Sequence, residues 1–187
     1  GRQEITTPWM GKDTARHYQW YPFVNMGHPA VARNQITENN GEFAGYMKKG
    51  LELTMLKAEK NPFLIGVPFI WCSNNLVAAI LTHAHLYSEI TGDNTFAEME
   101  AAHRDWLFGC NPWGTSMIVG LPENGDYPKF SHSSYVIKGG QVNGGLVDGP
   151  VYSTIFRSHS KYITMINKDV YSDVQPALAN YHDDITD

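Results

Sequence analysis

The chain has 187 residues, a formal net charge of −5, 42% hydrophobic residues and 12% aromatic residues. This length corresponds to about one domain, and the apolar content is too high for a disordered chain. The negative charge disfavours nucleic acid or an anionic membrane as a partner, because both attract basic surfaces, and a neutral ligand fits better.

The first part of the chain predicts a loop and then two helices. Residues 1–26 are rich in Trp, Tyr and Pro without a helical period, so we expect a loop that leads into a short helix near His28–Asn34. A break at Asn39–Gly41 precedes a helix over about Glu42–Glu59. One face of this second helix carries the residues that would contact a core: Phe43, Tyr46, Met47, Gly50, Leu51 and Thr54.

The segment Asn61–Trp71 contains two prolines and a glycine but is strongly apolar, which predicts a buried connecting loop. Ser73 is a favourable N-cap for the next helix, about Asn74–Thr91, which Gly92 ends. The inner stripe of that helix is expected to comprise Val77, Ile80, Leu81, Ala84, Tyr87 and Ile90.

A third long helix is predicted to begin at a capping box formed by Thr95 and Glu98 and to end at Gly109. Its apolar stripe would comprise Phe96, Met99, His103, Trp106, Leu107 and Cys110. Asn111-Pro112 cannot continue the helix, and the aromatic and small residues of Trp113–Gly120 favour a buried loop that lines a cleft.

The remainder of the chain begins with a long glycine-rich loop, Leu121–Pro150, of a length that is usually functional or disordered. Helical spacing then predicts a last helix over Val151–Ile166, followed by a polar stretch that ends in acids. Helices alternate with loops and no convincing alternating strand is present. The predicted fold class is therefore all-α, built from helical hairpins.

Several familiar kinds of site are disfavoured. Cys72 and Cys110 are too few for a zinc site or a disulfide framework. We expect both to be small buried thiols, and a disulfide between them remains an alternative. His83 and His85 lie two apart on a helix and point in opposite directions, so they cannot share a metal ion. Residues 139–149 are glycine-rich but lack the lysine of a phosphate-binding loop.

Four tracts together resemble glycoside hydrolase family 9, the inverting β-glucanases and cellulases. They are the W-x-S-N tract at Trp71–Asn74, the G-x-N-P-x-G-x-S tract at Gly109–Ser116, Gly144–Pro150, and the acidic segment Tyr181–Asp187. The resemblance implies part of an (α/α)6 toroid, with long loops that line a cleft. It also implies hydrolysis of a β-linked, cellulose-like glucan, no cofactor, no metal in this chain, and an extracellular or periplasmic setting.

The resemblance further implies that residues 1–187 are the C-terminal portion of a catalytic domain, truncated at both ends. The family's N-terminal segment with the catalytic base does not occur in the sequence, and the acid glutamate would be expected just after Asp187. The remainder of the catalytic domain is then the expected partner of this chain. The isolated chain is expected to be inactive.

Site residues follow from the same resemblance. Taken alone, Asp183, Asp184 and Asp187 are more simply explained as a solvated acidic terminus. The resemblance reverses this preference, because Asp183 matches a supporting aspartate that would raise the pKa of the acid glutamate. His132 matches a histidine of the cleft, but Ser134 stands where the family has an arginine. Trp71 and Trp113 are candidate platforms for sugar rings, with core packing as the alternative.

A second functional hypothesis is a non-catalytic helical module that binds carbohydrate or serves as a scaffold. It would keep the cleft aromatics and lose the catalytic carboxylates. The sequence leaves open which glucan is the substrate and whether cleavage is internal or from chain ends.

Overall fold

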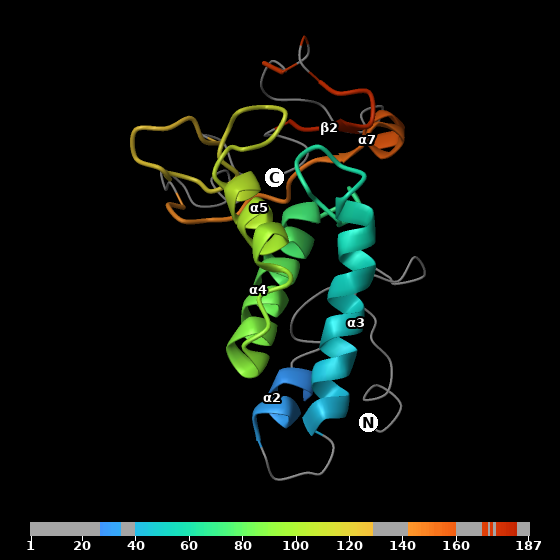
Figure 1. Cartoon of the computed structure of the whole chain (residues 1–187). Helices are drawn as coiled ribbons and strands as arrows, with labels where there is room; N and C mark the ends of the chain where they lie inside the picture. The colour runs from blue at the N-terminus through green and yellow to red at the C-terminus, as the bar shows by residue number, and fades with distance from the viewer. Residues whose placement is uncertain are drawn as a thin grey trace. The chain divides into compact units, whose positions relative to one another are not determined.

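The computed structural model describes residues 27–34, 40–128, 142–159, 170, 171, 173 and 175–182. The elements are α2 (Gly27–Arg33), α3 (Asn40–Ala58), α4 (Ser73–Thr91), α5 (Ala97–Leu107), β1 (Val151–Tyr152), α7 (Ser153–His159) and β2 (Ala179–Asn180), and Figure 1 labels each of them except β1. The described chain is mostly helical, which confirms the all-α class. The helices predicted near residues 28–34, 42–59 and 74–91 are present with ends shifted by one or two residues.

The chain divides into two compact units. The first unit comprises Gly1–Val67 and Leu76–Arg104, and the second comprises Pro68–Asn75 and Asp105–Asp187. Among the described residues, no helix is long and apolar enough to cross a membrane.

In the first unit, α3 presents the face that its sequence predicts. Phe43, Met47, Leu51 and Thr54 are buried at successive turns of the helix, as a period of 3.6 residues requires. Helix α2 lies against this helix through His28, whose ring centroid is 5.7 Å from that of Phe43. Burial of this stripe supplies the main stabilisation of α3, since its glycines weaken the isolated helix.

Helix α4 is buried over a wider arc than the predicted stripe. Val77, Ile80, Ala84 and Tyr87 are buried as expected, and His83 is buried as well. His85 is exposed and its Nδ1 lies 3.3 Å from a carboxylate oxygen of Glu100 on α5. The two histidines therefore point apart, as their spacing predicts.

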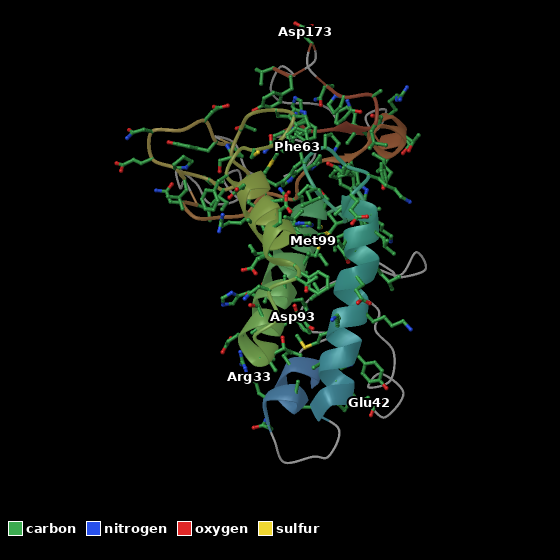
Figure 2. The ribbon with its side chains drawn as sticks, in the orientation of Figure 1. Arg33, Glu42, Phe63, Asp93, Met99 and Asp173 are labelled. Atoms are coloured by element: carbon green, nitrogen blue, oxygen red, sulfur yellow. The ribbon has the colours of Figure 1, made fainter. Side chains whose placement is uncertain are left out.

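Most of the stripe predicted for α5 is confirmed, and it is the inner face of the helix. Phe96, just before the helix, and Met99 and Trp106 within it are buried, and Met99 is labelled in Figure 2. Cys110 is exposed, which contradicts its place in the stripe and its expected burial. The reason is that α5 ends at Leu107, so residue 110 no longer follows the helical period. Cys72 is half-buried, and Cys72 and Cys110 do not form a disulfide with each other.

The apolar loop after α3 is buried at Ile65, Gly66, Val67 and Phe69, as predicted, whereas Pro62 is exposed and the other residues of 61–71 are half-buried. Gly66 lies so close to α3 that a Cβ there would be 2.3 Å from the carbonyl oxygen of Thr54. The N–H of Gly66 donates to Nε2 of His103 at 3.4 Å, and Nδ1 of that ring hydrogen bonds the Met99 carbonyl at 2.8 Å. Because a carbonyl can only accept, the His103 proton resides on Nδ1, and both ring nitrogens have partners.

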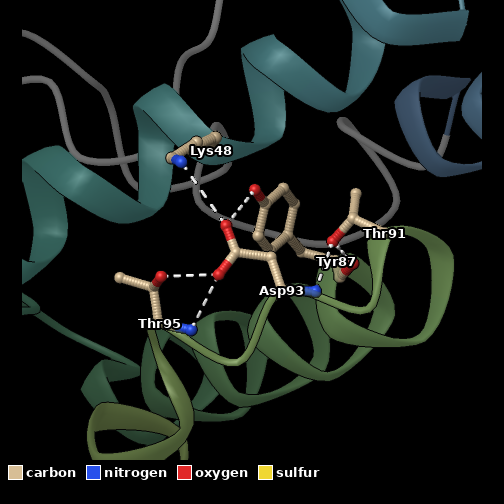
Figure 3. Close-up of polar contacts among 5 residues, drawn as sticks. All are labelled: Lys48, Tyr87, Thr91, Asp93 and Thr95. Atoms are coloured by element: carbon tan, nitrogen blue, oxygen red, sulfur yellow. Dashed lines mark hydrogen bonds and ion pairs between the residues drawn. The ribbon is translucent and has the colours of Figure 1, made fainter.

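The turn between α4 and α5 is organised by Asp93 (Figure 3). Its carboxylate accepts hydrogen bonds from the Thr95 hydroxyl at 2.5 Å, the Thr95 N–H at 3.0 Å and the Tyr87 hydroxyl at 2.8 Å. Lys48 of α3 adds an ion pair at 3.4 Å. These bonds, those from Thr95 above all, hold the pKa of Asp93 well below its usual value.

The predicted capping box of Thr95 and Glu98 is therefore wrong. The hydroxyl and the N–H of Thr95 are both directed to Asp93, an Asx-type turn that competes with the cap. The first N–H of α5, that of Ala97, instead donates to the Asn94 carbonyl at 3.0 Å.

In the second unit, the start of the predicted last helix is a strand. Val151 pairs with Asn180 and Tyr152 pairs with Ala179 in an antiparallel ladder. The helix begins only at Ser153, and residues 160–166 of its predicted span lie outside the described residues. Periodicity cannot reveal this change, because the backbone partner lies far along the chain.

We predict that the protein loses stability as the pH falls from about 6.5 towards 4. Burial lowers the pKa of His83 and of His103 from 6.5 to about 4, so in this window the unfolded chain binds more protons than the folded one. Each histidine should then cost up to roughly 3 kcal/mol of unfolding free energy by pH 4. Urea denaturation at a series of pH values measures the slope of the unfolding free energy against pH.

His83→Leu should flatten the slope by about half, because the Nε2 of His83 is buried without a hydrogen-bond partner and leucine removes the titrating group. His85→Gln is the matched control, since that ring is exposed. An unchanged slope in His83→Leu would show that this histidine is not a source of the acid lability.

Candidate functional site

The W-x-S-N tract fixes the start of α4 to the glycine-rich segment before β1. The Ser73 hydroxyl donates to the Pro150 carbonyl at 2.6 Å, and the Asn74 N–H donates to the Asp148 carbonyl at 2.9 Å. The Asn74 side-chain amide donates to the Val147 carbonyl at 3.0 Å. The expected N-cap role of Ser73 is not observed, because α4 begins at Ser73 itself, so that Ser73 is the first helical residue and not the cap before it. Two adjacent residues thus hold residues 147–150 in place.

Gly149 is required by the same arrangement. Its φ of +89° lies in the left-handed region that favours glycine. A Cβ at this position would come within 2.4 Å of the Asn74 side chain. The side chain of Asn74 is fully buried, so it has no room to move aside.

Trp71 directly precedes this junction. Its indole is half-buried and, together with Ile155, contacts a small apolar cluster of Val151 and Phe156. The next residue, Cys72, has a φ of +58°, an unfavourable value for a residue with a side chain. Such strain persists only where surrounding contacts fix the backbone, and here the hydrogen bonds of the following two residues do so. The indole is therefore held at a defined place and is partly exposed.

The N-P-x-G tract closes a loop at the end of α5 through Asn111. Its side-chain amide donates to the Trp106 carbonyl at 2.9 Å and to the Thr115 carbonyl at 2.8 Å. Its side-chain oxygen accepts from the Trp113 N–H at 3.1 Å. One buried asparagine thus satisfies a carbonyl at the end of the helix and both ends of the following turn.

Trp113 lies in an aromatic cluster of the second unit. Its ring meets those of Trp106 and Tyr181 edge-on, with centroids 6.0 Å and 5.8 Å apart. Its indole N–H donates to Oε1 of Gln175 at 2.7 Å, and the residue is only 7% exposed. Its role as a sugar platform stays a prediction, and the burial favours the alternative of core packing.

The tyrosine that begins the acidic segment is anchored on two sides. The Tyr181 ring is fully buried and contacts Trp113 and Tyr171. Its backbone N–H donates to Oε1 of Gln175 at 3.1 Å, and its carbonyl accepts from Nε2 of Gln175 at 2.5 Å. The next residue, His182, is also buried.

Two of the predicted site residues, Asp183 and His132, lie outside the described residues, as do Asp184 and Asp187. Their predicted roles stay predictions. Among the described residues, no group of three or more His, Cys, Asp or Glu side chains could hold a metal ion.

The sequence analysis did not predict the hydrogen bonds of three polar residues at the centres of these contacts: Asn74, Asn111 and Gln175. The first two lie inside the W-x-S-N and G-x-N-P-x-G-x-S tracts, so the motifs pointed to their positions but not to their bonds. Gln175 lies in a polar stretch with no local signal.

The sequence pattern of glycosyl hydrolase family 9 matches residues 4–187, and the chain belongs to this family. The comparison with curated proteins gave no match.

Two solved structures share the fold. They are the crystal structures of the glycoside hydrolase family 9 endoglucanase J30 and of its Zn-binding triple mutant, with TM-scores of 0.63 and 0.64 and 19% sequence identity. Each alignment covers 83% of this chain and 30% of the other chain, so this chain corresponds to about three tenths of their length. At this identity the likeness concerns the fold, and it confirms that the helices are part of an (α/α)6 toroid.

We predict that Gly149→Ala destabilises the protein more than Gly144→Ala. Both glycines have a left-handed φ, of +89° and +82°, so each alanine should cost about 1–2 kcal/mol from backbone strain. Only at Gly149 would the new Cβ meet the Asn74 side chain, since nothing lies within 4 Å at Gly144. Gly149→Ala should therefore cost roughly 1–3 kcal/mol more, through disturbed buried hydrogen bonds. Urea denaturation compares the two variants, and equal losses would contradict the close approach at Asn74.

Proposed function

We propose that this chain is part of an inverting β-glucanase that hydrolyses a cellulose-like glucan by general acid–base catalysis. The observation that supports this proposal is the family match over residues 4–187. Inverting hydrolysis needs an acid and a base roughly 6.5 to 9.5 Å apart, with a water between them. In this proposal Asp183 and His132 have supporting roles. The principal base and acid come from other parts of the catalytic domain, which is the partner of this chain.

The substrate is proposed to contact Trp71. Sugar rings have apolar C–H faces that stack on aromatic rings, and the half-buried indole of Trp71 is held in place by the residues around it. Trp113 is a weaker candidate because of its burial, and His132 is proposed to contact the sugar from the long loop. The net charge of −5 is compatible with a neutral polysaccharide. We place this activity outside the cytoplasm, as is typical of the family.

The test uses a protein that carries this chain within its complete catalytic domain. Reducing-sugar release should be observed from a soluble β-linked glucan and not from an α-linked glucan. NMR of the first products should show the anomer opposite to that of the substrate bond. Binding without hydrolysis would favour the carbohydrate-binding module instead, and retention of the anomer would contradict the inverting mechanism.

We predict that Trp71→Ala weakens the binding of a cello-oligosaccharide by about 1–3 kcal/mol, on the scale of ring stacking on aromatic side chains. Titration calorimetry on the complete domain measures the loss. Phe108→Ala is the control, because it removes an aromatic ring of the same unit that is 48% exposed and has no predicted contact with sugar. If a folded Trp71→Ala variant binds as tightly as the wild type, Trp71 is a core residue.

A further inference from the structure

We propose that Gln175 is a positioning residue that fixes the backbone from which the acidic segment extends. The proposal rests on the proposed function, in which Asp183 supports the catalytic acid. Gln175 lies in a segment without secondary structure, eight residues before Asp183 in the sequence. It belongs to none of the tracts that resemble the family.

The side-chain amide of Gln175 binds both polar groups of the Tyr181 backbone. Oε1 accepts from the Tyr181 N–H at 3.1 Å, and Nε2 donates to the Tyr181 carbonyl at 2.5 Å. A neighbouring β-strand would use the same pair of bonds, but β2 ends one residue earlier, at Asn180. Gln175 thus holds the chain at the point where the strand ladder no longer does.

A third hydrogen bond determines the orientation of this amide. Oε1 also accepts from the indole N–H of Trp113 at 2.7 Å, so two donors face the oxygen and one acceptor faces the nitrogen. If the oxygen and the nitrogen exchanged places, the amide NH2 group would face the two N–H donors and the amide oxygen would face the Tyr181 carbonyl. Only the observed orientation therefore satisfies all three partners. Through Trp113, the anchor is connected to the loop that Asn111 closes.

The anchor limits where the following residues can lie. Asp183 is only two residues beyond Tyr181 in the sequence, and a chain of two residues can span at most about 7 Å. The effect of a carboxylate on the pKa of a neighbouring acid decreases with distance, and a 1 Å displacement in an active site can reduce the rate about 100-fold. A fixed Tyr181 backbone would therefore set both the rate and the pH dependence of the reaction.

A purely structural role for Gln175 makes a different prediction. Loss of three hydrogen bonds in a loop would lower stability, with no specific effect on the turnover of the folded enzyme.

The positioning role predicts a decrease in kcat with little change in KM, because the proposed platform Trp71 is bonded to other segments. It also predicts a shift of the alkaline limb of the pH profile to lower pH. A displaced Asp183 carboxylate would no longer raise the pKa of the acid, which must be protonated to act.

The experiment compares Gln175→Leu and Gln175→Glu in the complete catalytic domain. Leucine removes all three hydrogen bonds. Glutamate keeps an acceptor for Trp113 and for the Tyr181 N–H but places a carboxylate oxygen against the Tyr181 carbonyl. We expect kcat to fall at least tenfold in Gln175→Leu and by a smaller factor in Gln175→Glu, with KM changed less than threefold in both.

Thr54→Val is the matched control. It removes one buried hydrogen bond, from the Thr54 hydroxyl to the Gly50 carbonyl, in the first unit. It should lower the melting temperature and leave kcat and the pH profile unchanged. If Gln175→Leu behaves in the same way as this control, the positioning role is overturned.

Amide hydrogen exchange provides a readout that does not depend on activity. The Tyr181 N–H should exchange at least tenfold faster in Gln175→Leu, while amides of α3 and α4 keep their protection. Unchanged exchange at Tyr181 would overturn the anchor itself. A wild-type enzyme without glucanase activity would instead overturn the proposed function and the catalytic role of the anchor, and the exchange rates would still decide whether Gln175 holds Tyr181.

Discussion

The second unit depends on the buried amide of Asn74. This side chain donates to the Val147 carbonyl and lies 3.4 Å from the indole nitrogen of Trp106, while its backbone N–H donates to the Asp148 carbonyl. A buried polar group without partners would cost about 1–3 kcal/mol, so the helix start and the glycine-rich segment are stable only together. This arrangement requires glycine at position 149, because the Cβ of any larger residue would displace the Asn74 side-chain amide.

The two units are stabilised by different means. In the first unit, amphipathic helices satisfy their own backbone groups and bury apolar stripes such as that of Phe43, Met47 and Leu51. In the second unit, the loops lack the regular backbone hydrogen bonds of a helix. The side-chain amides of Asn111 and Gln175 therefore provide hydrogen-bond partners for backbone groups there. A substitution of one amide there therefore affects several backbone groups at once.

This division matches the positions of the predicted site residues. Trp71, Trp113 and the tyrosine that begins the acidic segment all belong to the second unit, where loops present side chains and fixed hydrogen bonds limit their movement. The Cys72 backbone, with a φ of +58°, shows that strain is tolerated next to Trp71. If Trp71 contacts the substrate as proposed, an indole held in this way would lose little side-chain entropy on binding a rigid sugar ring.

The sequence by itself determined helices α2 to α5, most of their inner faces and the family, because periodicity and short motifs are local properties. It predicted the stripe of α3, the stripe of α5 apart from Cys110, the buried part of the apolar loop and the opposite directions of His83 and His85. The tertiary structure decided which partner each polar group found. Thr95 bonds Asp93 rather than Glu98, the Ser73 hydroxyl bonds Pro150, and Val151 pairs with Asn180. Gln175 has no local signal because its three bonds are to residues 6 and 62 positions away, and sequence patterns do not encode such distances.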